Sequence, residues 1–282
     1  MGIDARIIVY AIDQNQAEKA CTSAFARIAE LDECMSDYRI ESELNRLCRK
    51  AGSGPVKVSP DLLKVLLRAQ EVARLSNGAF DVTVGPVVRV WRAARKEKRL
   101  PMADEIKGAM EKVGWKKMKV SARSQTVTLW APGMQLDLGG IAKGYACDEA
   151  QRVLKRNGVS RALVEMGGDI VVSGPPPGKK GWSIRVPNAG KDMFFAHKSV
   201  SSSGDTEQFV EIGGRRYSHL IDPRTGQALI NRIQATVIAK DGLTSDPLTK
   251  ALSILSKREG LRVVRTYRGT KSYVRSLAWS KS

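Results

Sequence analysis

The sequence lacks any apolar run long enough to cross a bilayer, which excludes a membrane-spanning helix within its 282 residues. It has only four cysteines, with neither a CxxC pair nor the spacing of a zinc module; they are Cys21, Cys34, Cys48 and Cys147. We therefore expect buried free thiols, and a disulfide stays open only for an exported protein. No internal repeat or low-complexity tract is present, so a repeat architecture is excluded.

Acidic residues are scarce beside basic ones. Lys and Arg number 47, Asp and Glu number 29, and the net charge is +18. Such an excess can attract nucleic acid or an anionic membrane. The basic residues are spread along the chain, however, with short clusters only at residues 92–99 and 262–271, and no nucleic-acid-binding motif accompanies them. We therefore expect no nucleic-acid partner, and we attribute the charge to attraction of anionic nucleotides or of an anionic membrane surface.

The hydrophobic share of 42% and the charged share of 27% are typical of an ordinary globular protein. Apolar periodicity and capping residues predict helices over residues 15–35, 41–50, 59–75, 87–95, 104–113, 146–154, 245–255 and 258–266. Strands are predicted over residues 6–11, 162–166, 170–172, 182–186, 199–202, 207–212, 217–221, 234–240 and 273–279, with shorter ones around Met118, Val127 and Leu136. Helices and hairpins alternate without a βαβ rhythm. We therefore predict an α+β fold in a single compact domain, residues 1–282, with mixed or antiparallel sheets flanked by helices.

The central stretch, residues 136–145, is apolar and strand-like with one acid, Asp137, and turns on Gly139 and Gly140 into a helix. Paired glycines let the backbone approach a ligand closely. Free N–H groups at the start of the helix suit a phosphate, and Lys143 in its first turn adds a positive charge. The alternative is a tight strand-to-helix turn that binds no ligand.

Several other motifs accompany the central stretch in a fixed order. They are Met1-Gly2, Met35-Ser36-Asp37-Tyr38, the run from Gly78 to Pro86, Gly167-Gly168-Asp169-Ile170, Ser203-Gly204-Asp205, the run from His219 to Gly226, and Thr244-Ser245-Asp246. Together these motifs resemble the ApbE family of FAD:protein FMN transferases, and the resemblance covers nearly the whole chain. The central stretch and the run that starts at His219 are specific enough to make chance a poor explanation.

The resemblance implies a Mg²⁺-dependent enzyme with FAD as its substrate, which moves FMN onto a threonine hydroxyl of an acceptor protein and releases AMP. It also implies an acceptor motif of the Ser/Thr-Gly-Ala-Thr kind. This chain contains no such motif, so self-labelling is not expected. Two alternatives stay open. The nucleophile could be water, which gives an FAD pyrophosphatase producing FMN and AMP, or the protein could bind and carry FAD without chemistry.

By resemblance, the residues that bind FAD are Met1, Tyr38, Ala79, Phe80, Asp81, Asp137, Lys143 and Ile221. Several have a plainer explanation. Tyr38 could fill the core, residues 79–81 could form a buried turn, and Asp137 could accept backbone N–H groups. Lys143 could be a solvated lysine at a helix start, and Met1 could be frayed as a chain terminus. Thr206 stands where the family often has an aromatic residue, which leaves the contacts of that loop open.

The catalytic candidates are His219 and Asp246. His219 could take the proton from an attacking hydroxyl, although a lone histidine is often structural. The other histidine, His197, has no motif around it and is expected at the surface. Arg224, in the same run as His219, could pair with a phosphate or simply with Asp222.

The resemblance implies a metal shell made by the backbone carbonyls of Gly140 and Ala142, by Asp246, and by a hydroxyl one turn after it. This chain has Lys250 at the hydroxyl position, with Thr249 one residue earlier. If Lys250 pairs with Asp246, the ammonium competes with Mg²⁺ and the metal site is weakened or lost. If Lys250 swings outward, Asp246 stays free and Thr249 or a water completes the shell. We favour the second outcome; the alternative to any metal role is that Asp246 is a first-turn acid stabilised by the helix dipole.

No basic-then-apolar leader occurs in the sequence as given. It starts at Met1-Gly2, where members of the ApbE family already enter their first strand, and many members are exported, lipid-anchored proteins. We therefore expect an extracytoplasmic location, periplasmic or membrane-anchored, if a leader has been removed. A cytoplasmic location is expected if Met1 is the true start.

Overall fold

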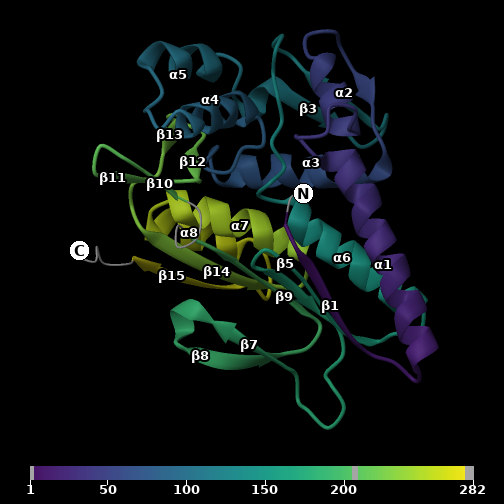
Figure 1. Cartoon of the computed structure of the whole chain (residues 1–282). Coiled ribbons are helices and arrows are strands. Elements are labelled where there is room, and N and C mark those ends of the chain that lie inside the picture. The colour runs from purple at the N-terminus through teal and green to yellow at the C-terminus, as the bar shows by residue number, and fades with distance from the viewer. Residues whose placement is uncertain (1–2, 205–208, 277–282) are drawn as a thin grey trace.

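The computed structural model describes residues 3–204 and 209–276. Its centre is a six-stranded sheet in the order β1-β5-β6-β9-β14-β15, in which every neighbouring pair is antiparallel (Figure 1). The strands are β1 (Ala5–Tyr10), β5 (Arg161–Met166), β6 (Asp169–Val172), β9 (Lys198–Ser203), β14 (Ile233–Ala239) and β15 (Lys271–Ser276). The predicted α+β class with antiparallel sheets is confirmed.

Helices cover one face of this sheet and a hairpin covers the other (Figure 1). On the helical face, α6 (Ala142–Arg156) lies against β5 and β6, α7 (Gly242–Ile254) lies against β9 and β14, and α1 (Gln14–Met35) packs on the outer side of α6. On the opposite face, the hairpin of β7 (Trp182–Val186) and β8 (Lys191–Phe195) closes a separate apolar cluster with side chains of the sheet. The sheet is therefore the middle of three layers, and α6 and α7 lie side by side on it.

A second, smaller part sits above the helical face in Figure 1. It contains α2 (Glu43–Arg49), α3 (Pro60–Leu75), α4 (Gly85–Lys96), α5 (Ala103–Met110), the short helix η1 (Trp115–Lys117) and the three-stranded sheet of β2 (Val56–Lys57), β4 (Thr126–Leu129) and β3 (Met118–Ser121). Trp91 of α4 is buried and donates its Nε1–H to the carbonyl of Gly226, 2.9 Å away. This bond ties α4 to the hairpin that carries the motif starting at His219.

The remaining elements are short. They are η2 (Pro187–Ala189), β10 (Phe209–Ile212), β11 (Arg215–Ser218), β12 (Ile221–Asp222), β13 (Gln227–Ala228) and α8 (Lys257–Arg265). Among the described residues, no helix combines the length and the apolar character that a bilayer crossing requires.

Local signals explain why most predicted helices were placed well. The side chain of Asp13 accepts the backbone N–H of Gln16 at the start of α1. Ser59 caps α3 in the same way, and Pro60 occupies its first position. The cap and the proline act within a few residues, so the sequence is enough to locate these helix starts.

Several predictions about local structure were wrong or incomplete. Residues 136–138 form no strand, because the N–H of Asp137 is bonded to the carbonyl of Val82 in a loop. Helix α7 begins at Gly242, where Asp241 caps it, so Asp246 lies in the second turn. Strand β8 was not foreseen, and the strand predicted over residues 217–221 is broken between β11 and β12. The predictions for Met1, Asp205 and Thr206 and the ends of two strands, residues 207–208 and 277–279, lie outside the described residues.

Candidate functional site

A cleft of about 1260 Å³ lies where the upper part of the molecule meets the central turn and the turn between β5 and β6. Ligand pockets for drug-sized molecules have about 300–1,000 Å³, so the cleft has room for a larger ligand. It brings together predicted site residues from widely separated segments: Tyr38, Ala79, Phe80, Asp81, Asp137, Gly140, Ala142, Lys143, His219, Ile221 and Lys250. Asp246 and Thr249 are fully buried directly behind it on α7.

The central turn is held by its own side chains. Asp137 Oδ1 accepts the N–H of Gly139 at 2.8 Å, and Lys143 Nζ donates to the carbonyl of Gly139 at 2.8 Å. Gly144, in the first turn of α6, is required by packing. A Cβ placed on it would lie 2.2 Å from the carbonyl oxygen of Gly242, which leaves no space for any side chain. Gly144 is therefore explained by the close contact of α6 with α7, and the two interpretations of Gly139 and Gly140 stay open.

One wall of the cleft is organised around Arg92 of α4. Its guanidinium is bonded to Asp37 and lies 3.1 Å from Asp137 Oδ2. It also lies over the ring of Tyr38, 4.5 Å from the ring centroid. Burial raises the pKa of Asp137 and the charge of Asp37 raises it further, whereas the N–H of Gly139 and the charge of Arg92 lower it. Sequence reasoning assigned Arg92 only to a basic cluster and missed this role.

The residues predicted to contact FAD differ in exposure. Tyr38 is 68% exposed, so it does not fill the core, and the part of its ring that Arg92 leaves uncovered can pack on a ligand. Ala79 and Phe80 are buried and border the cleft. Asp81 is buried and its carboxylate accepts both the N–H and the hydroxyl of Thr83, so it also supports a buried turn. The buried turn is therefore present, and FAD binding by residues 79–81 stays a prediction.

Two lysines and two carboxylates meet at the start of α6. Lys143 Nζ lies 3.2 Å from Asp169 Oδ2 and 3.7 Å from Asp246 Oδ2, and Lys250 Nζ is bonded to Asp246 Oδ1. Asp169 is 1% exposed, and its buried carboxylate forms an ion pair with Lys143. Its motif was noticed in the sequence, but its place in this cluster was not predicted.

Charge and burial act in opposite directions on these groups. Burial alone would lower the pKa of Lys143, but the charges of Asp246 and Asp169 outweigh it and raise the pKa. Burial and the nearby charge of Asp246 raise the pKa of Asp169. Burial would raise the pKa of Asp246 as well, yet Lys143 and Lys250 hold it below the usual value. Asp246 is therefore an ionised carboxylate held by two ammonium groups.

The favoured expectation for Lys250 was wrong. Its side chain turns back onto Asp246, one helical turn earlier, because a buried carboxylate without a cation would be costly. Thr249 points its hydroxyl at the backbone carbonyl of Asp246, 2.7 Å away, and does not line the cleft. The other explanation for Asp246, a first-turn acid, was wrong as well, because α7 starts earlier than predicted. Among residues 3–204 and 209–276, no cluster of three or more His, Cys, Asp or Glu side chains could hold a metal.

The second wall carries His219, on the connection between β11 and β12. His219 is half-buried and borders the cleft, and Ile221 after it is buried. Arg224 is paired with both carboxylate oxygens of Asp222, at 2.8 and 2.9 Å, which agrees with the simpler of its two interpretations. His197 is exposed, as expected. The four cysteines are free thiols, two of them buried and two partly buried.

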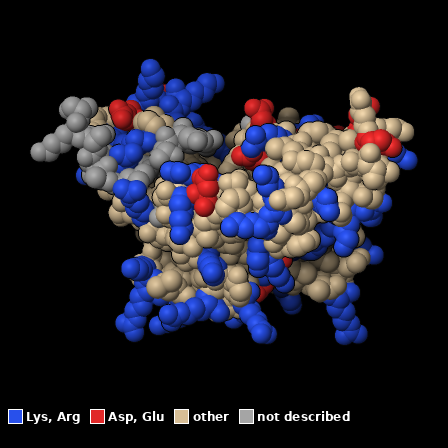
Figure 2. All heavy atoms as spheres, turned by 90° about the horizontal axis from the view of Figure 1, so that it is seen from below, with Lys and Arg blue, Asp and Glu red and all other residues tan. Residues whose placement is uncertain are grey.

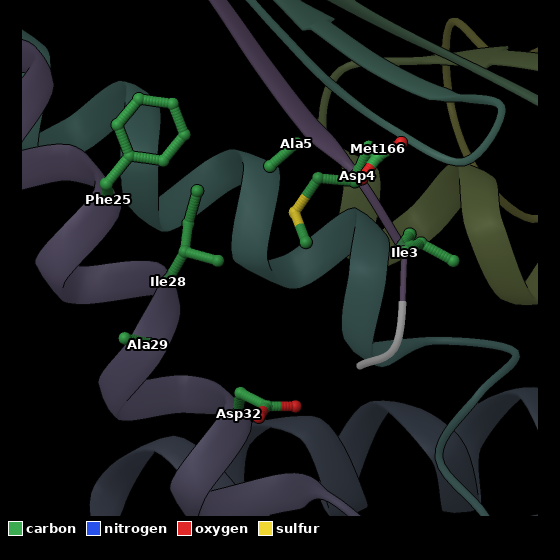
Figure 3. A pocket seen from close by; sticks show the side chains of 8 residues that line it. All are labelled: Ile3, Asp4, Ala5, Phe25, Ile28, Ala29, Asp32 and Met166. Carbon is green, nitrogen blue, oxygen red and sulfur yellow. The ribbon is translucent and has the colours of Figure 1, made fainter.

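A second hollow, of about 440 Å³, lies between α1 and β1 (Figure 3). Phe25, Ile28 and Ala29 point into it from the helix, and Met166 closes it from β5. None of the predicted site residues lines it. The candidate site is therefore the larger cleft.

Comparison with known proteins shows the family of the chain and leaves the site a prediction. The model of the ApbE family matches residues 1–274. The chain belongs to the ApbE family. It is 30% identical to the FAD:protein FMN transferase of Vibrio cholerae over 270 residues, which cover 88% of this chain and 80% of that protein. It is also 30% identical to the FAD:protein FMN transferase of Treponema pallidum over 275 residues, 90% of this chain and 76% of that protein.

Solved structures of this family have the same fold. A mutant of the flavin transferase ApbE from Vibrio cholerae superimposes with a TM-score of 0.86 at 28% identity, covering 99% of this chain and 95% of that one. The ApbE protein of Thermotoga maritima superimposes with a TM-score of 0.85 at 27% identity, covering 98% and 91%. The ApbE fold expected from the motifs is therefore confirmed.

Proposed function

We propose that this chain transfers the FMN half of FAD to a threonine hydroxyl of an acceptor protein and releases AMP. The observation that carries the proposal is the convergence, in one cleft of an ApbE-family protein, of an exposed aromatic ring, the start of α6, the lysines Lys143 and Lys250, and a histidine. Tyr38 and Phe80 are suited to the flavin or the adenine, and the start of α6 with Lys143 and Lys250 is suited to the phosphates. FAD as the substrate is supported by the names of the curated relatives.

The reaction is a displacement at the FMN phosphorus. The threonine oxygen bonds to that phosphorus, the bond from it to the bridging oxygen breaks, and AMP leaves with the bridging oxygen. His219 borders the cleft and is the candidate to take the hydroxyl proton. Lys143 and Lys250 are the candidates to bind the phosphate oxygens and stabilise the charge that develops on AMP.

Magnesium dependence stays a prediction, and the arrangement of the described residues speaks against it. The donors for Mg²⁺ would be Asp246, the carbonyls of Gly140 and Ala142, and Thr249. Asp246 Oδ1 is bonded to Lys250, and Oδ2 accepts the N–H of Gly144 at 3.1 Å and faces Lys143. Because Mg²⁺ needs oxygen ligands at about 2.0–2.1 Å, it could use this carboxylate only after Lys250 has been displaced. We therefore assign no step to a metal.

Incubating the protein with FAD separates the proposed transfer from its two alternatives. The acceptor is a peptide with a Ser/Thr-Gly-Ala-Thr motif, and its matched control has alanine in place of the final threonine. Covalent flavin on the first peptide alone supports transfer to threonine. Free FMN and AMP without labelled peptide would indicate an FAD pyrophosphatase, and bound but intact FAD would indicate a carrier.

An anionic membrane surface is a further proposed partner. The face seen from below, which includes the hairpin of β7 and β8, carries many Lys and Arg side chains and few acidic ones (Figure 2). Exposed basic residues of this region are Lys179, Lys180, Arg185 and Lys191. Cosedimentation with anionic vesicles, weakened by salt and absent with neutral vesicles, is the expected result. The extracytoplasmic location expected from the family stays a proposal of the same kind.

A further inference from the structure

Lys250 lies where α7, the central turn and Phe80 meet. Its Nζ is bonded to Asp246 Oδ1, and its side-chain stem covers Gly140. A Cβ placed on Gly140 would lie 3.3 Å from Cγ and 3.7 Å from Cδ of Lys250. The Lys250 side chain is 15% exposed and borders the cleft. The ammonium is therefore anchored from behind and is still open to a bound ligand.

The charges around Asp246 favour an ammonium group over a divalent metal ion as its partner. Lys143 and Lys250 carry two positive charges, and Asp169 and Asp246 carry two negative charges when ionised. Both carboxylates are at most 1% exposed, so their charges are balanced inside the protein and not by solvent. A divalent cation next to Asp246 would stand beside two ammonium groups, and the like charges would repel one another. Thr249, whose hydroxyl donates to the carbonyl of Asp246, does not line the cleft.

The same geometry suits a phosphate. An ammonium has three N–H donors, and Asp246 accepts one from Lys250. The start of α6, whose helix dipole favours an anion, is on the same side of the cleft as Lys143 and Lys250. Two ammonium groups and a helix start therefore converge on the part of the cleft that is best suited to the pyrophosphate of a dinucleotide.

We propose that the ammonium of Lys250 binds the FAD phosphates in the place of a divalent cation, so that flavin transfer by this chain needs no divalent cation. This inference rests on the function proposed above. As the bond to the bridging oxygen breaks, negative charge grows on the AMP phosphate. Lys250 donates N–H groups to the phosphate oxygens and keeps its proton, and Asp246 acts as the positioning residue that holds the ammonium in place.

Metal binding tests the inference without any turnover. Mg²⁺ and, in a separate experiment, Mn²⁺ are titrated calorimetrically into the FAD-free protein. We expect Lys250→Thr to bind the metal at least about tenfold more tightly than the wild type, because the substitution frees Asp246 Oδ1 and adds a hydroxyl. Lys257→Thr is the matched control, since Lys257 is exposed on α8 outside the cleft. Wild-type binding as tight as that of Lys250→Thr would overturn the inference.

The second test compares transfer in a chelator with transfer in excess Mg²⁺. The wild type should work equally well in both, whereas Lys250→Ala should lose about 100- to 1,000-fold in the chelator and regain part of this loss with Mg²⁺. Lys257→Ala should behave as the wild type. Wild-type transfer that stops in the chelator and returns with Mg²⁺ would overturn the inference and leave the proposed function intact.

The two proposals fail in different ways. If FAD binds but is neither transferred nor split in any condition, the proposed function fails. The calorimetric titration still decides the inference in that case, because it reports whether Lys250 excludes the metal from Asp246. Loss of FAD affinity in Lys250→Ala, with Lys257→Ala unchanged, would support contact between the ammonium and the phosphates.

Discussion

Helices α6 and α7 each contribute one aspartate, Asp148 and Asp246, that accepts backbone N–H groups at the start of the other helix. The pKa of Asp148 is raised, whereas that of Asp246 is lowered. Asp246 of α7 accepts the N–H of Gly144 in α6, and Asp148 of α6 accepts the N–H groups of Gly242 and Leu243 in α7, at 2.8 and 2.9 Å. The backbones touch between them, since a Cβ on Gly242 would lie 2.2 Å from the carbonyl oxygen of Gly144. The two acids thus form a reciprocal pair of helix caps.

The difference lies in the cations. Two lysine ammonium groups contact Asp246, whereas none of the described Lys or Arg side chains forms an ion pair with Asp148. Burial raises the pKa of Asp148 to about 7, although the two N–H groups work against this. Lys143 and Lys250 hold the pKa of Asp246 below its usual range despite burial. Both aspartates cap a helix through their position. Only Asp246 also belongs to a charged site, because Lys143 and Lys250 at the cleft contact it.

The two aspartates should differ most in their effect on catalysis. Asp246→Asn should reduce flavin transfer by at least about 100- to 1,000-fold, because Lys250 loses the carboxylate that holds its ammonium in place. Asp148→Asn should stay within about tenfold of the wild type, since the cap is away from the cleft. Initial rates with FAD and an acceptor peptide check both, and circular dichroism checks folding. Equal losses of transfer rate in Asp246→Asn and Asp148→Asn would contradict a special role of Asp246 in catalysis.

Substitution of His219 tests whether this histidine of the cleft takes part in the reaction. His219→Ala should slow transfer by about 100- to 10,000-fold, the usual contribution of a general base, and leave FAD binding nearly unchanged. His197→Ala is the matched control, because His197 is exposed on a turn before β9. Rates and fluorescence titrations with FAD give the two readouts. Full activity of His219→Ala would reduce this histidine to a structural role.

Asp148 should matter for stability. In Asp148→Asn, one of the two N–H groups at the start of α7 loses its acceptor and faces an amide N–H. We expect a loss of about 1–3 kcal/mol in the free energy of unfolding, measured in urea. A stability equal to that of the wild type would show that the cap contributes nothing.

Asp148 also predicts a pH dependence of stability. Its pKa rises from 3.8 to about 7 on folding, so the folded protein binds the extra proton between these values. Stability from this group is therefore present at low pH and is lost as pH rises through the window, by up to about 1.4 kcal/mol per pH unit. Urea unfolding at several pH values should show this slope in the wild type and not in Asp148→Asn. An unchanged slope in the variant would assign the dependence to other groups.

The smallest effect concerns Cys147, which neighbours Asp148 on α6. It is fully buried, and burial raises the pKa of its thiol well above the ordinary value, so the reactive thiolate is suppressed. Iodoacetamide at pH 8 should leave Cys147 unmodified in the native protein, as judged by peptide mass spectrometry. Asp148→Asn should raise its modification only slightly. Rapid labelling in the native wild type would contradict the burial on which the comparison depends.

The sequence alone determined the family, the α+β class and most helices, because these depend on local signals and on motif order. Ser59 and Pro60 indicate a helix start from local sequence alone. The run from His219 to Gly226 can be identified as a family motif without a structure. It also predicted that Asp137, Lys143 and His219 would share one site. Their sharing of one cleft agrees with that prediction, and their roles stay proposals.

Only the tertiary structure decided the direction of Lys250 and the partners of Arg92 and Asp169. A lysine one turn after an aspartate can turn toward it or toward solvent, and local sequence does not distinguish the two. The choice follows from burial of Asp246 against α6 and from the space beside Gly140, both set by elements that lie about a hundred positions apart in the chain. A long, flexible side chain takes its conformation from its neighbours in space, and the tertiary fold brings those neighbours together.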